Sequence, residues 1–189
     1  ARARPDEFLA LCHRIDRETS GVLLLAKDRE CERFIKRILE ERDEGKYKVD
    51  KTYLAITWGV PRHERFRVDH ALKLDETHRF RVKMRVGDGE ADALSAATRF
   101  QVVAVRRHRT DPSRRYALVR CELETGRQHQ IRAHLAAIGN PIVGDKLYGP
   151  DEELFARGAD GTLTAEDLDV LELSRHALHA HELTLPHPS

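Results

Sequence analysis

The segment from His13 to Gly21 brings together residue types that could do chemistry. Asp16 lies between Arg14 and Arg17, and neighbouring positive charge favours the ionised form of a carboxylate. The glycine permits a tight turn and an apolar run follows it, so the carboxylate would lie on a loop just ahead of a buried strand. An aspartate that only forms bonds within its own loop is the ordinary alternative. The segment is therefore compatible with nucleophilic or proton-transfer chemistry.

The His-Arg pair ahead of Asp16 also occurs in the catalytic loop of protein kinases. In that loop the aspartate directly follows the arginine, and kinases also carry a glycine-rich loop and a DFG triplet. Here Ile15 separates Arg14 from Asp16, and neither of the other two features occurs. The sequence therefore excludes a kinase.

A second segment, residues 125–135, places an arginine beside apolar residues at helical spacing. Gln128, Ile131, Arg132 and Leu135 would share one face of a helix. An arginine on that face could pair with a buried carboxylate, while the apolar side chain supports a flat ring. An ordinary amphipathic helix with solvated arginines fits the spacing equally well.

Positive charge is concentrated in one part of the chain, although the net charge is +1. Residues 106–134 hold eight arginines and three acidic residues, whereas residues 150–189 hold two basic and nine acidic residues. Binding of phosphates needs local positive charge. Charge alone therefore leaves two interpretations equally open: a surface that includes Arg106, Arg107 and Arg109 and contacts an RNA backbone, with the acidic stretch facing away, or a solvated arginine-rich face.

Strands and helices must position these residues, and the residue pattern predicts many strands interrupted by a few helices. Strands are predicted by alternation or by short apolar runs, and helices by 3.6-residue spacing with caps at Asp28 and Thr164. Because βαβ alternation is absent, we expect an α+β domain on a largely antiparallel sheet. The predicted strands are a buried one at 22–26 and those near 51–58, 65–71, 80–86, 97–105, 116–124 and 178–185; the predicted helices follow Asp28 and cover 128–138, ended by Gly139-Asn140-Pro141, and 165–173.

The bulk composition predicts one globular domain over residues 1–189. The chain has 189 residues, of which 40% are hydrophobic and 34% charged, which suits a folded domain with a core. The sequence contains no run of about 18 apolar residues, so it predicts no membrane span. The N-terminus does not have the pattern of a secretory signal. Three cysteines without CxxC spacing argue against a disulfide framework or a zinc knuckle and favour a reducing cytosol.

Four motifs, in order along the chain, resemble those of the RluA-type pseudouridine synthases. HRIDRETSGVLLLAK, which begins at His13, matches the family pattern HRLDxxTSGxxxxAK, and Lys51 to Gly59 match KxYxAxxxG. Residues 125–149 match TGRxHQIRxHLxxxGxPIxGDxxYG at nearly every fixed position, and residues 178–188 match LHAxxLxxxHP. Together the four motifs cover most of the chain.

The resemblance implies the pseudouridine synthase fold and an enzyme that isomerises uridine in structured RNA without a metal or organic cofactor. It implies that Asp16 is the essential carboxylate, which attacks or deprotonates the nucleoside after the base is flipped out. Tyr53 would stack on the base and relay a proton, and Ile131 would pack against the uracil. Arg132 would hold the aspartate by a salt bridge, and Arg14 would fill the space that the flipped nucleotide leaves.

The resemblance also bears on the substrate and on the extent of the domain. The run Phe8-Leu9-Ala10-Leu11 ahead of HRID is similar to that of the ribosomal large-subunit enzymes, so we expect large-subunit ribosomal RNA as the substrate, with transfer RNA as the alternative. Family members carry a KPxG loop ahead of HRLD and further strands after HP, which do not occur here. We therefore expect a catalytic domain that is shortened at both ends and lacks an S4 domain. We also expect the protein to be a monomer in the cytoplasm.

Two other classes of protein compete with this interpretation. A non-catalytic RNA-binding module on the same scaffold would be expected to have lost Asp16, which is present here. A metallohydrolase would use histidines such as His176, His179 and His181, but their spacing lacks HExxH. We therefore expect no metal, and structural or RNA-facing roles for these histidines.

Overall fold

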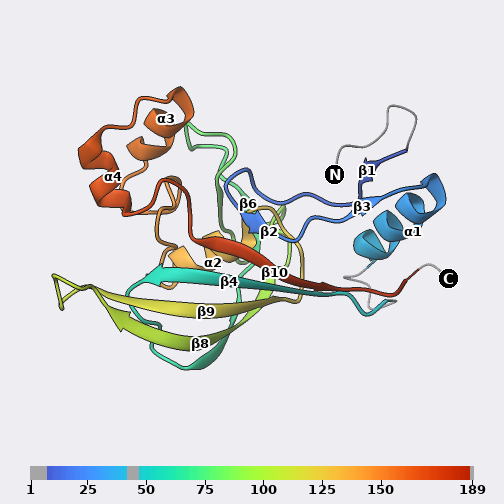
Figure 1. Cartoon of the computed structure of the whole chain (residues 1–189), viewed down its shortest axis with the longest axis horizontal. Helices are drawn as coiled ribbons and strands as arrows, with labels where there is room; N and C mark the ends of the chain where they lie inside the picture. The colour runs from blue at the N-terminus through green and yellow to red at the C-terminus, as the bar shows by residue number, and fades with distance from the viewer. Residues whose placement is uncertain (1–7, 42–46, 188–189) are drawn as a thin grey trace.

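A computed structural model describes residues 8–41 and 47–187, so Pro188 of the fourth motif lies outside the described residues. Figure 1 shows a broad sheet with α2 against one face, while α3 and α4 lie together at the upper left. In chain order the elements are β1 (Ala10–Leu11), β2 (Ser20–Gly21), β3 (Leu25–Ala26), α1 (Arg29–Glu40), β4 (Asp50–Trp58), β5 (Arg65–Asp69), β6 (Leu72–Leu74), β7 (Met84–Val86), β8 (Ala97–Arg107), β9 (Arg115–Leu123), α2 (Gln130–Ala137), α3 (Glu153–Asp160), α4 (Ala165–Leu171) and β10 (Leu178–Thr184).

The main sheet has six strands in the order β2-β10-β4-β9-β8-β5. Its neighbouring strands are antiparallel, except that β2 and β10 are parallel. The mostly antiparallel α+β architecture confirms the fold class predicted from the sequence. Tyr53 pairs with Cys121 on one side and with Ala180 on the other, so the fourth motif lies beside the second.

The core lies between one face of this sheet and α2. Along β4 the predicted alternation is present, because Ala55 is fully buried whereas its neighbour Ile56 is 40% exposed. From the helix, Ile131 and Leu135 pack against the same face, as their helical spacing predicts. The buried members of this cluster are Ala55, Val68, Phe100, Ala117, Val119, Cys121, Ile131, Leu135, Ile142 and Leu178.

Two of the predicted helices begin at the predicted caps. The Asp28 carboxylate accepts a hydrogen bond from the Cys31 amide at 2.7 Å, and Thr164 forms a capping box with Asp167. The helix α3 was not predicted from the sequence. It is tied to α4 by Arg157, which donates two hydrogen bonds to Asp167 at 2.8 and 2.7 Å, so a contact outside its own segment stabilises it.

Three predicted elements differ from the structure. Residues 22–26 do not form a buried strand: Val22 and Leu23 are 40% and 39% exposed, because the chain leaves β10 after Gly21 and pairs with β1 only at β3. The strand predicted at 80–86 is shortened to β7, since the residues before it form turns. The helix predicted from 128 begins at Gln130, so Gln128 does not share its face.

No helix in residues 8–41 and 47–187 is long and apolar enough to cross a membrane.

Gly21 allows a close approach that positions the loop before it. Its φ is +115°, and a Cβ there would lie 2.1 Å from the Ala180 carbonyl oxygen. We expect Gly21→Ala to lower the free energy of unfolding by about 3 kcal/mol or more, because backbone strain and a backbone clash add. Gly89→Ala is the control: φ is +80° and no atom lies within 4 Å, so strain alone should cost about 1–2 kcal/mol. Equal urea midpoints for the two variants would contradict the prediction.

Candidate active site

A cavity of about 290 Å³ is lined by all five residues for which the resemblance implies a role in the active site. It lies between the loop that carries Asp16, the start of β4 and the segment that leads into α2. Three chain segments far apart in sequence therefore meet here. The lining residues are Arg14, Ile15, Asp16, Thr19, Lys51, Tyr53, Leu123, Gly126, Arg127, Gln128, His129, Gln130, Ile131, Arg132 and Leu178.

A backbone hydrogen bond closes the loop that carries Asp16, and two side-chain contacts attach this loop to buried residues. The Thr19 amide donates to the Asp16 carbonyl at 2.9 Å, and the Thr19 hydroxyl lies 2.8 Å from Nε2 of the buried His176. Glu18 accepts from Nζ of the buried Lys146 at 2.6 Å. These contacts attach the loop to the protein interior, which is how a reactive group on a loop obtains a fixed position.

Arg132 binds two carboxylates, and the tighter pair is with Asp145. Its Nε and Nη2 donate to the two oxygens of Asp145 at 2.6 and 2.8 Å, whereas Nη1 donates to Oδ2 of Asp16 at 3.0 Å. Asp145 also accepts from the Leu147 and Tyr148 amides. The pair with Asp16 is the one expected from the motifs, whereas Asp145, which also belongs to the third motif, was not among the predicted site residues.

The charges in this group support one another. Burial lowers the pKa of the Arg132 guanidinium, but its hydrogen bonds to Asp145 and the two neighbouring carboxylates outweigh burial and raise the pKa above its ordinary value. Burial raises the pKa of Asp145, yet the hydrogen bonds and charge of Arg132 outweigh it and lower that pKa. Both groups therefore stay charged at neutral pH, so Arg132 presents a fixed positive charge to Asp16.

Tyr53 and Ile131 form apolar walls of the cavity. Tyr53 is half-buried on β4 and packs against the main core, while Ile131 is 4% exposed in the first turn of α2. Both side chains belong to elements of the rigid core, so the cavity walls are preformed. A flat ring that entered between them would be held beside Asp16. Arg14 is exposed and lines the mouth of the same cavity.

The buried Gln130 organises the loop that leads into α2. Its side-chain oxygen accepts from the Arg127 amide at 2.9 Å and from the Thr125 hydroxyl at 2.8 Å. Its amide nitrogen donates to the Ala97 carbonyl and lies 2.9 Å from the Thr98 hydroxyl. The third motif therefore serves the cavity partly through a side chain that does not itself do chemistry.

The arginines predicted to bind the RNA backbone lie away from this cavity. Arg106 and Arg107 are exposed at the end of β8, and Arg109 is exposed on the β8–β9 hairpin, seen at the far left of Figure 1. Tyr53 pairs with Cys121, whereas Arg106 pairs with Tyr116, five residues earlier in β9. At 3.4 Å per residue this places Arg106 about 17 Å from the position of Tyr53 along the sheet.

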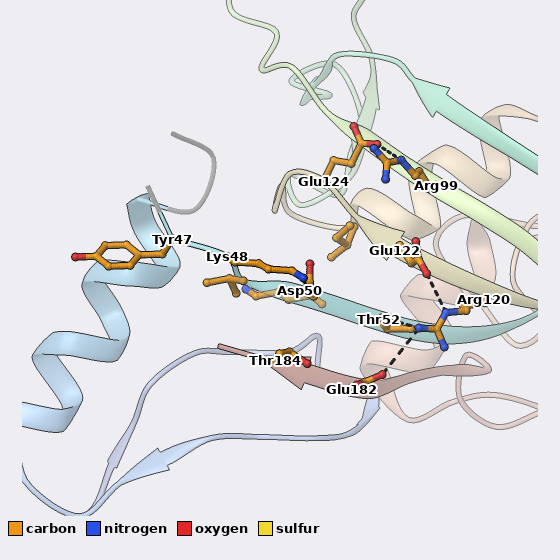
Figure 2. A pocket seen from close by; sticks show the side chains of 13 residues that line it. Tyr47, Lys48, Asp50, Thr52, Arg99, Arg120, Glu122, Glu124, Glu182 and Thr184 are labelled. Carbon is orange, nitrogen blue, oxygen red and sulfur yellow. Dashed lines mark hydrogen bonds and ion pairs between the residues drawn. The ribbon is translucent and has the colours of Figure 1, made fainter. Parts of the chain in front are cut away.

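A larger cavity of about 750 Å³ shares Lys51 and Leu123 with the first. Figure 2 shows that acidic side chains accompany its basic ones. Arg99 lies 2.6 Å from Glu124, and Arg120 lies 3.0 Å from Glu122. Four acidic residues thus balance its four basic ones, so this cavity lacks the net positive charge that a phosphate site needs.

The histidines considered for a metal site form other contacts. His176 is buried against Thr19, and Nδ1 of His179 lies 2.9 Å from the Ser20 hydroxyl. Among the described residues no three His, Cys, Asp or Glu side chains are grouped as a metal site would require.

The mostly antiparallel sheet has the architecture that the motifs predict, and the cavity brings residues of the motifs together. A family model described as RNA pseudouridylate synthase matches residues 2–137. The chain therefore belongs to the RNA pseudouridylate synthase family.

Individual relatives agree with this assignment. The chain is 37% identical over 179 residues to "Ribosomal large subunit pseudouridine synthase D" of Xanthomonas campestris, covering 93% of this chain and 46% of that protein. It is 33% identical over 176 residues to "Uncharacterized RNA pseudouridine synthase YhcT" of Bacillus subtilis, covering 93% and 47%. The solved structure of "Human RNA Pseudouridylate Synthase Domain Containing 1" matches with a TM-score of 0.75 at 27% identity, covering 95% of this chain and 65% of that one. The chain thus spans about half the length of these two bacterial relatives.

Proposed function

We propose that this chain is the catalytic domain of an RNA pseudouridine synthase, in which Asp16 initiates the isomerisation. The observation that carries the proposal is the hydrogen bond from Arg132 to Asp16 in a cavity also lined by Tyr53 and Ile131. The reaction breaks the bond from N1 of uracil to C1′ of ribose and forms the bond from C5 to C1′; C5 loses its proton to solvent and N1 gains one in its place. It needs no oxidant, reductant or co-substrate, so protein side chains suffice.

The size of the cavity supports a flipped nucleoside as the bound species. A volume of about 290 Å³ is close to the lower end of small-ligand cavities, roughly 300 Å³, which suits a single nucleoside rather than a base pair stacked in a helix. The target uridine would therefore leave its stack. Tyr53 and Ile131 would hold the uracil, and the exposed Arg14 would occupy the vacated space, for which a planar cation is suited.

The ionised Asp16 would act on the sugar or the base as the glycosidic bond breaks. Charge develops on both parts at that step, and a positioned carboxylate can meet it covalently, by proton transfer or electrostatically. Arg132 keeps one carboxylate oxygen in place, which restricts the Asp16 side chain to fewer conformations before the reaction. A non-catalytic RNA-binding module would not need this charge network.

We propose large-subunit ribosomal RNA as the substrate, with transfer RNA as the alternative, because the name of the Xanthomonas relative specifies the ribosomal large subunit. The protein would act as a monomer in the cytoplasm, where bacterial ribosomes are assembled. Light scattering of the purified protein tests the monomer directly.

The activity is tested by release of tritium from RNA that carries uridine labelled at C5. The full-length protein, incubated with large-subunit RNA from cells that lack the gene, should release tritium in proportion to the pseudouridine formed. Transfer RNA from the same cells is the parallel substrate. Absence of release from both RNAs would overturn the proposed function.

The hairpin arginines give a separate prediction about docking. Replacing Arg106, Arg107 and Arg109 with Gln should flatten the dependence of log affinity on log salt by about 0.7–0.9 for each phosphate that is no longer neutralised. The rate at saturating RNA should stay nearly unchanged, since these residues lie far from Asp16. Binding measured by filter retention across a salt series checks this expectation.

The matched control replaces Arg67, Arg99 and Arg120 with Gln. These three arginines are paired with carboxylates, whereas the hairpin three form no ion pair within residues 8–41 and 47–187. The control should therefore change the salt slope less. If the hairpin variant keeps the wild-type slope and loses turnover instead, these arginines serve the active site rather than docking.

A further inference from the structure

His129 belongs to the third motif and lies beside Asp16, but it was not among the predicted site residues. It immediately precedes α2, and its side chain is 12% exposed, between those of Tyr148 and Asp16. Nδ1 lies 3.1 Å from the hydroxyl oxygen of Tyr148, and Nε2 lies 3.9 Å from Oδ2 of Asp16. His129 thus connects the buried tyrosine with the proposed catalytic carboxylate.

The backbone of His129 is strained. Its φ is +54°, a region that residues other than glycine seldom adopt. Such conformations persist where the surroundings over-determine them, and they concentrate at functional sites. Here the Tyr148 ring packs edge-on against the imidazole, with centroids 5.7 Å apart, and the His129 carbonyl accepts from the Ala133 amide at 2.9 Å. Ring and backbone are therefore both held.

The neighbouring tyrosine determines which ring nitrogen carries the proton. The Tyr148 hydroxyl oxygen accepts from the Met84 amide at 2.8 Å, and burial raises the pKa of Tyr148, so the phenol keeps its proton. In the described part of the chain Nδ1 of His129 is the acceptor within reach of that proton. Tyr148 therefore donates to Nδ1, and a neutral His129 must carry its own proton on Nε2.

His129 is neutral at physiological pH. Burial lowers its pKa to about 4, and the charge of Arg132 acts in the same direction, while Asp16 and Asp145 oppose both. The proton on Nε2 thus belongs to a fixed neutral donor that lines the cavity. A neutral imidazole whose tautomer is set by its other nitrogen is an arrangement that enzymes use to hold a reacting partner.

We propose that His129 is a positioning residue for Asp16: its Nε2–H is a second donor, beside Nη1 of Arg132, to Oδ2 of the carboxylate. With Oδ2 held by two donors, Oδ1 is the oxygen that reacts with the uridine. The separation of 3.9 Å must shorten by about 1 Å to form a charge-assisted hydrogen bond, and such bonds tighten when substrate binds. This inference rests on the proposed function of the cavity.

Two amide substitutions of His129 distinguish loss of the hydrogen-bond donor to Asp16 from loss of the volume of the imidazole ring. Asn in His129→Asn tolerates positive φ but ends near the position of Nδ1, so the donor to Asp16 is lost. Gln in His129→Gln reaches the position of Nε2 and can donate through its amide. Loss of a hydrogen bond to a charged group should reduce the single-turnover rate of His129→Asn about 10- to 100-fold. RNA affinity should stay unchanged, and His129→Gln should recover most of the rate.

The wild-type protein offers a test that does not depend on activity. Nitrogen-15 NMR of the His129 ring at pH 7 should find the proton on Nε2, and Tyr148→Phe should allow the other tautomer. A proton on Nδ1 in the wild type would overturn the proposal, as would equal single-turnover rates for His129→Asn and His129→Gln. Wild-type protein that releases no tritium would instead overturn the proposed function, while the NMR result would still decide the tautomer.

Discussion

Replacing Asp16 with Asn is expected to abolish pseudouridine formation while leaving the fold and RNA affinity intact. Asparagine has nearly the same shape, and its side-chain oxygen can still accept from Nη1 of Arg132, which lies 3.0 Å from the Asp16 carboxylate. What it lacks is the negative charge that nucleophilic attack or proton removal requires. We expect the rate to fall by about 10⁴-fold, the upper range for a positioned acid–base group.

The assay is tritium release under single-turnover conditions at saturating RNA. The control Asp169→Asn removes a charge from an exposed position on α4 and should behave as the wild type. Melting temperature and RNA affinity should coincide for all three proteins. Residual release by Asp16→Asn within about 10-fold of the wild type would refute the assignment of Asp16, since a loss of only about 1.4 kcal/mol of transition-state stabilisation does not indicate an essential group.

Replacing Arg132 with Ala is expected to give the largest loss of stability among changes in the site. Asp145 has no exposed surface in its side chain and receives both of its charge-assisted hydrogen bonds from Arg132. Removing the guanidinium would leave a buried carboxylate without its counterion, which typically costs about 3–5 kcal/mol. Arg132→Lys should restore the charge but not the two-pronged geometry, so it should recover stability only in part.

Urea unfolding of these two variants and of three further ones shows whether the unpaired Asp145 carboxylate causes the loss of stability. Arg120→Ala removes an arginine that is 35% exposed and pairs with Glu122, and should cost no more than about 1 kcal/mol. The double variant Arg132→Ala with Asp145→Asn should be more stable than the sum of the two single changes predicts, because the stranded charge is gone. Equal stability of Arg132→Ala and the wild type would refute the pairing.

Local patterns predicted those elements whose reasons lie within their own segments. The caps Asp28 and Thr164 were found because a side-chain oxygen bonds to an amide three residues ahead. The alternation from 51 to 58 predicted which side chains share a face of β4. The apolar run at 22–26 was wrongly assigned to a buried strand, because hydrophobicity alone does not say whether a partner strand reaches that far. Helix α3 was missed because a salt bridge to α4 stabilises it.

The sequence by itself determined the family and the residues expected in the active site, because the motifs preserve residue types at fixed spacing. Tertiary structure decided how the charges are shared. Arg132 lies 13 residues from Asp145 and 116 from Asp16, and only folding reveals that the guanidinium binds the former with two nitrogens and the latter with one. The role inferred for His129 likewise depends on Tyr148 meeting its Nδ1 across 19 residues. Spacing along a chain records which residues are present, whereas hydrogen-bond directions exist only once distant segments meet.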